Sequence, residues 1–195
     1  PNDDISMTRI LTSAACDARM SGVNMPVMSS AGSGNHGLTA VIPPTVVCEH
    51  MGYNNEKLAR TLVFSHLTTS YIKTFTGRLS AVCGCAIAAG IGASASITWA
   101  LGGTDKQIEG AINNMVASLA GMVCDGAKSS CAAKISIAVE TALQALDMSI
   151  HQCVFQPGEG LSMSTAEKTI ATVGRTARVG MKSTDVEILN IMLGS

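Results

Sequence analysis

The segment from residue 79 to residue 103 constrains the fold most, because it contains no charged side chain and is rich in Gly, Ala and Ser. A helix built from it presents small residues on every face, which lets neighbouring helices approach closely. A stretch this long and uncharged also raises the question of a membrane span. Its small residues partition weakly into lipid, and no cluster of basic residues flanks it. The sequence therefore favours a helix buried in a crowded protein core, and we expect no membrane partner.

Apolar residues recur three or four positions apart along most of the chain, which is typical of α-helices, and strand-type alternation is nearly absent. We therefore predict an all-α fold, a compact multi-helix domain with buried Gly/Ala-rich helices. Stop signals and caps place the expected helices at residues 5–20, 38–51, 56–75, 83–101, 105–123, 134–150, 164–179 and 185–193.

Local signals predict several of these helix ends. Pro43 and Pro44 are expected near the start of their helix, where the missing amide donor of a proline costs little. Asn54-Asn55 is expected to cap the following helix. Capping boxes, in which a Ser or Thr is followed three residues later by Glu or Gln, are expected at Thr104–Gln107 and Ser164–Glu167.

Composition limits the partners of this chain. Only 14% of its 195 residues are charged, against about a quarter in a typical domain, so another domain or subunit is expected to cover part of the surface. The net charge of −1, the lack of a basic run and the 3% aromatic content argue against nucleic acid as a partner. We expect the covering partner to be a missing N-terminal region of the same protein, a second copy in a homo-oligomer, or both.

The first residues, Pro-Asn-Asp-Asp, include neither a starting Met nor a signal segment. We therefore interpret residues 1–195 as a C-terminal domain of a longer protein, or as a trimmed piece of one. The seven cysteines are odd in number and come without a secretory signal, which does not suggest a disulfide framework. We expect a cytoplasmic protein whose thiols either bind a metal or cluster or are simply buried.

The first candidate functional segment is the glycine-rich turn Ser29–Gly37, which precedes an expected helix. Glycines let the backbone present its amides, and a helix N-terminus adds unpaired donors and a partial positive charge. Such a turn suits a carboxylate or phosphate. The same pattern also suits an ordinary helix entry. From the pattern alone, that second interpretation is the stronger one. The turn is not a P-loop, because Gly-Lys-Ser/Thr does not follow.

Two further segments carry cysteines. Cys83-Gly84-Cys85 lies at the head of the uncharged helix, and Met122–Cys131 lies between two expected helices. A polar loop that ends a buried helix is a suitable place for soft thiolate ligands. The spacing matches neither a zinc ribbon nor a ferredoxin-type run. From spacing alone, buried structural cysteines are therefore the stronger interpretation.

Taken in order, these segments resemble the alpha-chain domain of bacterial iron–sulfur L-serine dehydratases, and more closely the related L-cysteine desulfidases. The resemblance covers about residues 10–145. Ala31–Gly37 is similar to the family's turn before a helix, Gly84–Gly92 to its first cysteine segment, and Gly121–Gly126 with Cys131 to its Gly-Met-Val-Cys-Asp-Pro segment. Three ordered matches with similar intervals are more specific than any single match.

The chain departs from the dehydratase pattern at several positions. The Gln and Glu that follow the family's first cysteine are Ala86 and Ala88 here, and the interval to the last cysteine is shorter. The Asn35-His36 turn also differs. These differences favour the desulfidase branch, and they make Cys131 the least secure of the expected ligands.

The resemblance implies a catalytic-type domain with a 4Fe-4S cluster held by Cys85, Cys124 and Cys131, and Cys83 is the competitor of Cys85. One iron would stay open and act as a Lewis acid toward a small amino-acid substrate. The implied reaction is a lyase-type α,β-elimination that converts L-cysteine to pyruvate, ammonia and sulfide. L-Serine is the alternative substrate, because it differs only in the leaving atom.

The resemblance also suggests roles for polar residues. His36 and Lys134 are candidate catalytic residues. Lys128 and Lys134 are candidates to balance the negative charge of the cluster, or are solvated lysines. Two other functions stay open: a non-catalytic iron–sulfur sensor, and a structural domain without a cofactor. The glycine-rich turn supplies the candidate ligands of the substrate carboxylate, Ser33, Gly34, Asn35 and His36.

Overall fold

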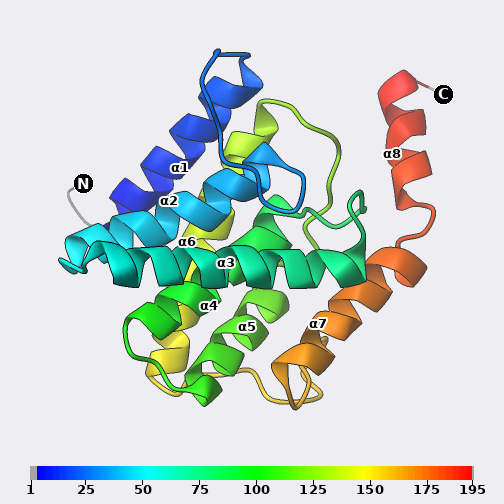
Figure 1. Cartoon of the computed structure of the whole chain (residues 1–195). Coiled ribbons are helices and arrows are strands. Elements are labelled where there is room, and N and C mark those ends of the chain that lie inside the picture. Colours follow the sequence, from blue (N-terminus) through cyan, green and yellow to red (C-terminus); the bar gives the residue numbers. More distant parts are fainter. Residues whose placement is uncertain (1–3, 195) are drawn as a thin grey trace.

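Helices dominate residues 4–194, the part of the chain that the computed structural model describes (Figure 1). These residues form two isolated β-bridges but no β-strand, which confirms the predicted all-α fold. The elements, with η for a π-helical turn, are α1 (Asp4–Met20), α2 (Gly34–His50), α3 (Asn55–Thr76), η1 (Cys85–Ala89), α4 (Gly90–Ala100), α5 (Asp105–Leu119), α6 (Ser130–Ile150), α7 (Ala166–Arg175), η2 (Thr176–Gly180) and α8 (Thr184–Leu193).

Helix α4 lies in the core, and its residues 90–98 are all buried, as expected for the uncharged segment. It packs against α2, α3, α5 and α6. A β-carbon at Gly92 would collide with the backbone oxygen of Ser65 on α3. Ser94 donates a hydrogen bond to the backbone oxygen of Ala142 on α6, at 2.9 Å. Small side chains therefore set the distances between α4 and its neighbours.

Helix α2 begins at Gly34, earlier than predicted, so the expected position of the prolines is wrong. Pro43 and Pro44 lie in the middle of the helix. Pro44 has no amide hydrogen to donate to the backbone oxygen of Ala40, one turn before it. Ser65 on α3 donates its hydroxyl to that oxygen instead, at 2.7 Å. A neighbouring helix therefore replaces the hydrogen bond that the proline removes.

The uncharged segment becomes helical at Cys85 and not, as predicted, at Cys83, and it does so through the π-helical turn η1. The preceding residues 81–83 pair antiparallel with residues 122–124. Because the pairing draws residues 122–124 away from the helix before them, α5 ends at Leu119 instead of continuing to residue 123.

Other helix ends test the local signals. The capping box at Thr104–Gln107 is confirmed. The one at Ser164–Glu167 is wrong, because Thr165 is the N-cap of α7. Helix α6 begins at Ser130, before the predicted start, which places Cys131 in its first turn rather than in the loop.

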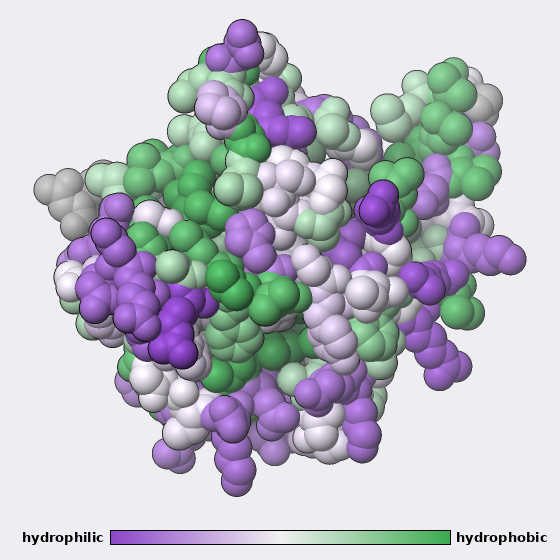
Figure 2. Space-filling view, viewed as in Figure 1, coloured by the Kyte–Doolittle hydropathy of each residue, from purple (hydrophilic) through white to green (hydrophobic). Residues whose placement is uncertain are grey.

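An apolar groove crosses the outer face of α3, where α3 meets α4, α5 and α7. Figure 2 shows apolar surface in the middle of this face. Helix α8 stands away from the other helices and buries none of its residues (Figure 1). Within residues 4–194, every helix is too short or too polar to cross a membrane. The groove is lined mainly by Ala59, Val63, Phe64, Leu67, Tyr71, Trp99, Ile108, Ile112 and Ile170.

We expect Gly92→Ala to lower the free energy of unfolding by about 1–3 kcal/mol, because its methyl group would press on Thr69 and Ser65 of α3. Gly121→Ala is the matched control, since a β-carbon there meets no atom within 4 Å. Urea denaturation of both variants measures the difference. Unchanged stability of the Gly92 variant would show that this glycine does not set the distance between α3 and α4.

Candidate functional site

The antiparallel pairing of residues 81–83 with residues 122–124 brings two cysteine segments together. The amides of Cys83 and Cys124 each donate a backbone hydrogen bond across the pair, at 2.9 and 2.6 Å. The side chains of Cys83, Cys85 and Cys124 consequently lie in one small cluster. Cys83 is buried, whereas Cys85 and Cys124 are partly exposed. Two segments that are distant in the sequence therefore form one site.

Cys131 reaches the same site from the first turn of α6. It packs with Cys85 against one group of buried residues, and its thiol donates to the backbone oxygen of Gly126 at 3.6 Å. A hydrogen bond with Cys83 and burial raise the pKa of Cys85, and negative charge on Cys131 and Cys124 raises it further. Cys83, Cys124 and Cys131 therefore lie near enough to Cys85 for their charges to act on its thiol.

Cys83 and Cys85 form a coupled pair of thiols. A hydrogen bond from Cys85 lowers the pKa of Cys83 to about 6, against the opposing effect of burial. The backbone amide of Ala86 and the charge of Lys134 act in the same direction. One thiol of the pair therefore loses its proton near neutral pH. The thiolate is the form that binds iron.

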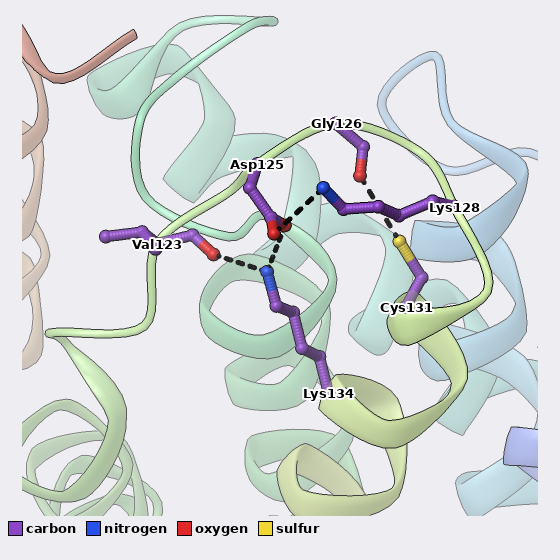
Figure 3. Close-up of polar contacts among 6 residues, drawn as sticks. All are labelled: Val123, Asp125, Gly126, Lys128, Cys131 and Lys134. Atoms are coloured by element: carbon purple, nitrogen blue, oxygen red, sulfur yellow. Dashed lines mark hydrogen bonds and ion pairs between the residues drawn. The ribbon is translucent and has the colours of Figure 1, made fainter. Parts of the chain in front are cut away.

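Asp125 holds the loop between α5 and α6, as Figure 3 shows. Its carboxylate forms ion pairs with Lys134 on α6 and with Lys128, the latter at 3.0 Å. Lys134 also donates to the backbone oxygen of Val123 at 3.0 Å. The hydrogen bonds from Lys134 and Lys128 lower the pKa of Asp125 to about 2. Both lysines thus fasten the loop that joins Cys124 to Cys131 in the first turn of α6.

The second half of the glycine-rich turn, from Gly34 to Gly37, forms the first turn of α2. Ser33 is the N-cap, and its hydroxyl accepts a hydrogen bond from the amide of His36 at 3.4 Å. Arg19, near the end of α1, donates to the side-chain oxygen of Asn35 at 2.9 Å. A β-carbon at Gly34 would collide with the same guanidinium. The arginine therefore adds its positive charge to the positive end of the α2 dipole.

His36 connects this turn with the cysteines. Its side chain is 6% exposed, and its Nδ1 has no hydrogen-bond partner within the described part of the chain. Its Nε2 lies against Gly84, where a β-carbon would collide with the ring. Burial, and then the charge of Lys73, lower the pKa of His36 to about 4, so the imidazole is neutral at pH 7. A neutral imidazole therefore separates the turn from Cys83-Gly84-Cys85.

Comparison with known proteins assigns the chain to a family. A model of the serine dehydratase alpha chain matches residues 3–190. The chain belongs to this family. Over 98% of its length it is 52% identical to a UPF0597 protein of Clostridioides difficile and 50% identical to a UPF0597 protein of Caldanaerobacter subterraneus. It spans 45% of the length of each of these relatives, and no solved structure matches it.

Thiolates are the ligands that iron–sulfur clusters take, and this site contains several cysteines. Within residues 4–194, no group of three or more His, Cys, Asp and Glu side chains is placed to hold a metal ion. A four-iron cluster makes a different demand, because each thiolate binds a separate iron. Cys85, Cys124 and Cys131 come to the site from η1, from the loop after α5 and from the first turn of α6.

Lys73, like Arg19, is a residue at the site that the sequence patterns did not reveal. It lies in the last turn of α3, and its side chain is 7% exposed. The available signal was its position on one helix face with Ser65 and Thr69, all of which are buried. Because that face carries hydroxyl groups instead of apolar side chains, hydrophobic periodicity does not predict its burial.

Proposed function

We propose that this chain is the iron–sulfur domain of a lyase that converts L-cysteine to pyruvate, ammonia and sulfide. The observation that carries the proposal is the convergence of the four thiols with the first turn of α2 at His36. Membership of the serine dehydratase alpha chain family supports an elimination reaction. Ala86 and Ala88 depart from the dehydratase pattern and favour cysteine. L-Serine is the alternative substrate.

In this proposal, Cys85, Cys124 and Cys131 hold a 4Fe-4S cluster. When bound, the cluster supplies a Lewis-acidic iron that polarises the carboxylate and the leaving atom of the substrate. Cys83 is the competitor of Cys85 for its ligand position, because the hydrogen bond from Cys85 lowers the pKa of Cys83 to about 6. Lys134 and Lys128 fix the loop between Cys124 and α6 through Asp125, and Lys134 brings positive charge toward the thiols.

The first turn of α2 is the proposed site for the substrate carboxylate. The backbone amides of a helix N-terminus point toward an anion, and the helix dipole favours negative charge there. Arg19 adds a cation to the same end and orients Asn35 by a hydrogen bond. We assign carboxylate binding to this turn, through Ser33, Gly34, Asn35 and His36.

His36 is the proposed general base for the α-proton. Burial keeps the imidazole neutral at pH 7, and a neutral imidazole has one unprotonated ring nitrogen that is able to accept a proton. Lys134 is the second candidate from the sequence. Its ammonium is paired with Asp125, so we assign it to positioning the loop and give His36 the proton transfer.

Cysteine variants test the cluster directly. We expect Cys124→Ala to lose most of its iron and its sulfide release from L-cysteine, because one thiolate ligand is removed. Cys153→Ala is the matched control, since Cys153 is exposed and lies outside the cysteine site. Iron, acid-labile sulfide and the visible spectrum are measured on full-length protein purified without oxygen.

The same measurement separates the alternative functions. A brown protein without turnover on L-cysteine or L-serine would favour a sensor. A colourless, iron-free wild type after anaerobic reconstitution would contradict the proposal and favour a structural domain. Faster pyruvate formation from L-serine than from L-cysteine would assign the chain to the dehydratase reaction.

His36→Asn tests the proton transfer. We expect kcat to fall by about 100-fold or more, with iron content unchanged, because general bases typically contribute a factor of this size. His151→Asn, which changes an exposed histidine beside Asp147, is the control. Steady-state kinetics on L-cysteine measure the effect. An unchanged kcat would exclude His36 as the base.

We assign the apolar groove on α3 to the rest of a longer cytoplasmic protein, in which residues 1–195 are one domain. The chain spans 45% of the length of its relatives, and Leu67 and Tyr71 are 65% and 42% exposed in the groove. Covering apolar side chains of this size stabilises a domain contact.

Leu67→Glu in the full-length protein should lower its melting temperature by several degrees, through loss of that contact. Val179→Glu, at an apolar residue that is 68% exposed and lies outside the groove, should have little effect. Calorimetry and light scattering provide the measurements. A drop in molecular mass would instead assign the groove to a homo-oligomer, and no change in either quantity would contradict both assignments.

A further inference from the structure

The ammonium of Lys73 lies among the thiols of the site. Its Nζ is 3.2 Å from the position that a β-carbon would occupy at Gly84, between the two cysteines of that segment. Cys124, Cys85 and Cys83 are the thiols whose charge acts on it. The lysine therefore approaches the site from α3, on the same side of Gly84 as His36.

Lys73 is buried, but no carboxylate pairs with it among the residues that the structure describes. Its side chain is 7% exposed, yet no carboxylate forms an ion pair with it within the described part of the chain. A buried ammonium without a paired charge is costly, because it has lost its hydration without compensation. Lys134 differs in this respect, since Asp125 already pairs with it. The groups left to compensate Lys73 are thiolates.

We propose that Lys73 is the buried counter-cation of the cysteine site, where its ammonium offsets the negative charge of Cys85 and Cys124 as ligands of an iron–sulfur cluster. This inference rests on the proposed function. A cluster with three thiolate ligands carries net negative charge, and in a buried site a nearby cation stabilises it strongly. The neighbouring histidine does not supply this charge, because burial keeps His36 neutral.

The proposal predicts effects of opposite sign in the two forms of the protein. Without the cluster, Lys73 is a buried charge with which no carboxylate pairs among residues 4–194, so Lys73→Met should raise the melting temperature. With the cluster, the same variant loses the compensating charge and should release iron to a chelator several-fold faster. A residue that serves only to pack α3 would not produce this reversal.

The experiment compares wild type, Lys73→Met, Lys73→Arg and Lys106→Met, all as full-length protein reconstituted without oxygen. Lys106 is exposed at the start of α5 and serves as the control for loss of a lysine. We expect Lys73→Met to shift the midpoint potential of the cluster to a more negative value, since reduction adds a negative charge that the lysine stabilises. Lys73→Arg should keep the wild-type potential because it keeps the charge.

The outcomes are distinguishable. If wild type holds a cluster while Lys73→Met keeps the wild-type potential and iron-release rate, the role of Lys73 is overturned and the proposed function stands. If Lys73→Arg behaves as Lys73→Met does, shape rather than charge is responsible, which also overturns the inference. If wild type holds no cluster, both proposals fail together.

Discussion

The backbone pairing between residues 81–83 and residues 122–124 is the interaction on which the site depends. Its hydrogen bonds, donated by Cys83 and Cys124, fasten the turn before α4 to the loop after α5. Each such bond contributes only about 1 kcal/mol net, but leaving a buried backbone group unpaired costs more. The pairing is therefore the arrangement that satisfies both segments at once. Without it, the cysteines of these segments would belong to separate surfaces.

Polar side chains around α4 are hydrogen-bonded to backbone groups, whereas a ring nitrogen of His36 at the site is not, in the part of the chain that the structure describes. Around α4, hydroxyl groups pair with backbone oxygens, as Ser94 does with Ala142 and Ser65 does with Ala40. At the site, the Nδ1 of His36 has no partner and no carboxylate pairs with Lys73 among residues 4–194. An unsatisfied buried polar atom lowers stability, so its presence at His36 is typical of a functional site.

Contiguous motifs made part of the site predictable. The sequence predicts roles for Cys85, Cys124, Cys131 and the first turn of α2, because each lies in a short segment that resembles the serine dehydratase alpha chain family. Lys73 lies outside those segments and comes beside Gly84 only through the packing of α3. Resemblance transfers residues within a motif, but it does not give the neighbours that reach the motif from other helices.

The sequence by itself determined the helical class, the burial of the uncharged segment and the caps at Asn54 and Thr104, since these depend on contacts within a turn or on composition. Only the tertiary structure decided where α2, α4 and α6 begin. Pro44 is tolerated inside α2 because a serine of α3 takes over its hydrogen bond, and Cys83 stays extended because its amide bonds to a distant loop. A local sequence pattern does not identify such partners, because only folding brings them close.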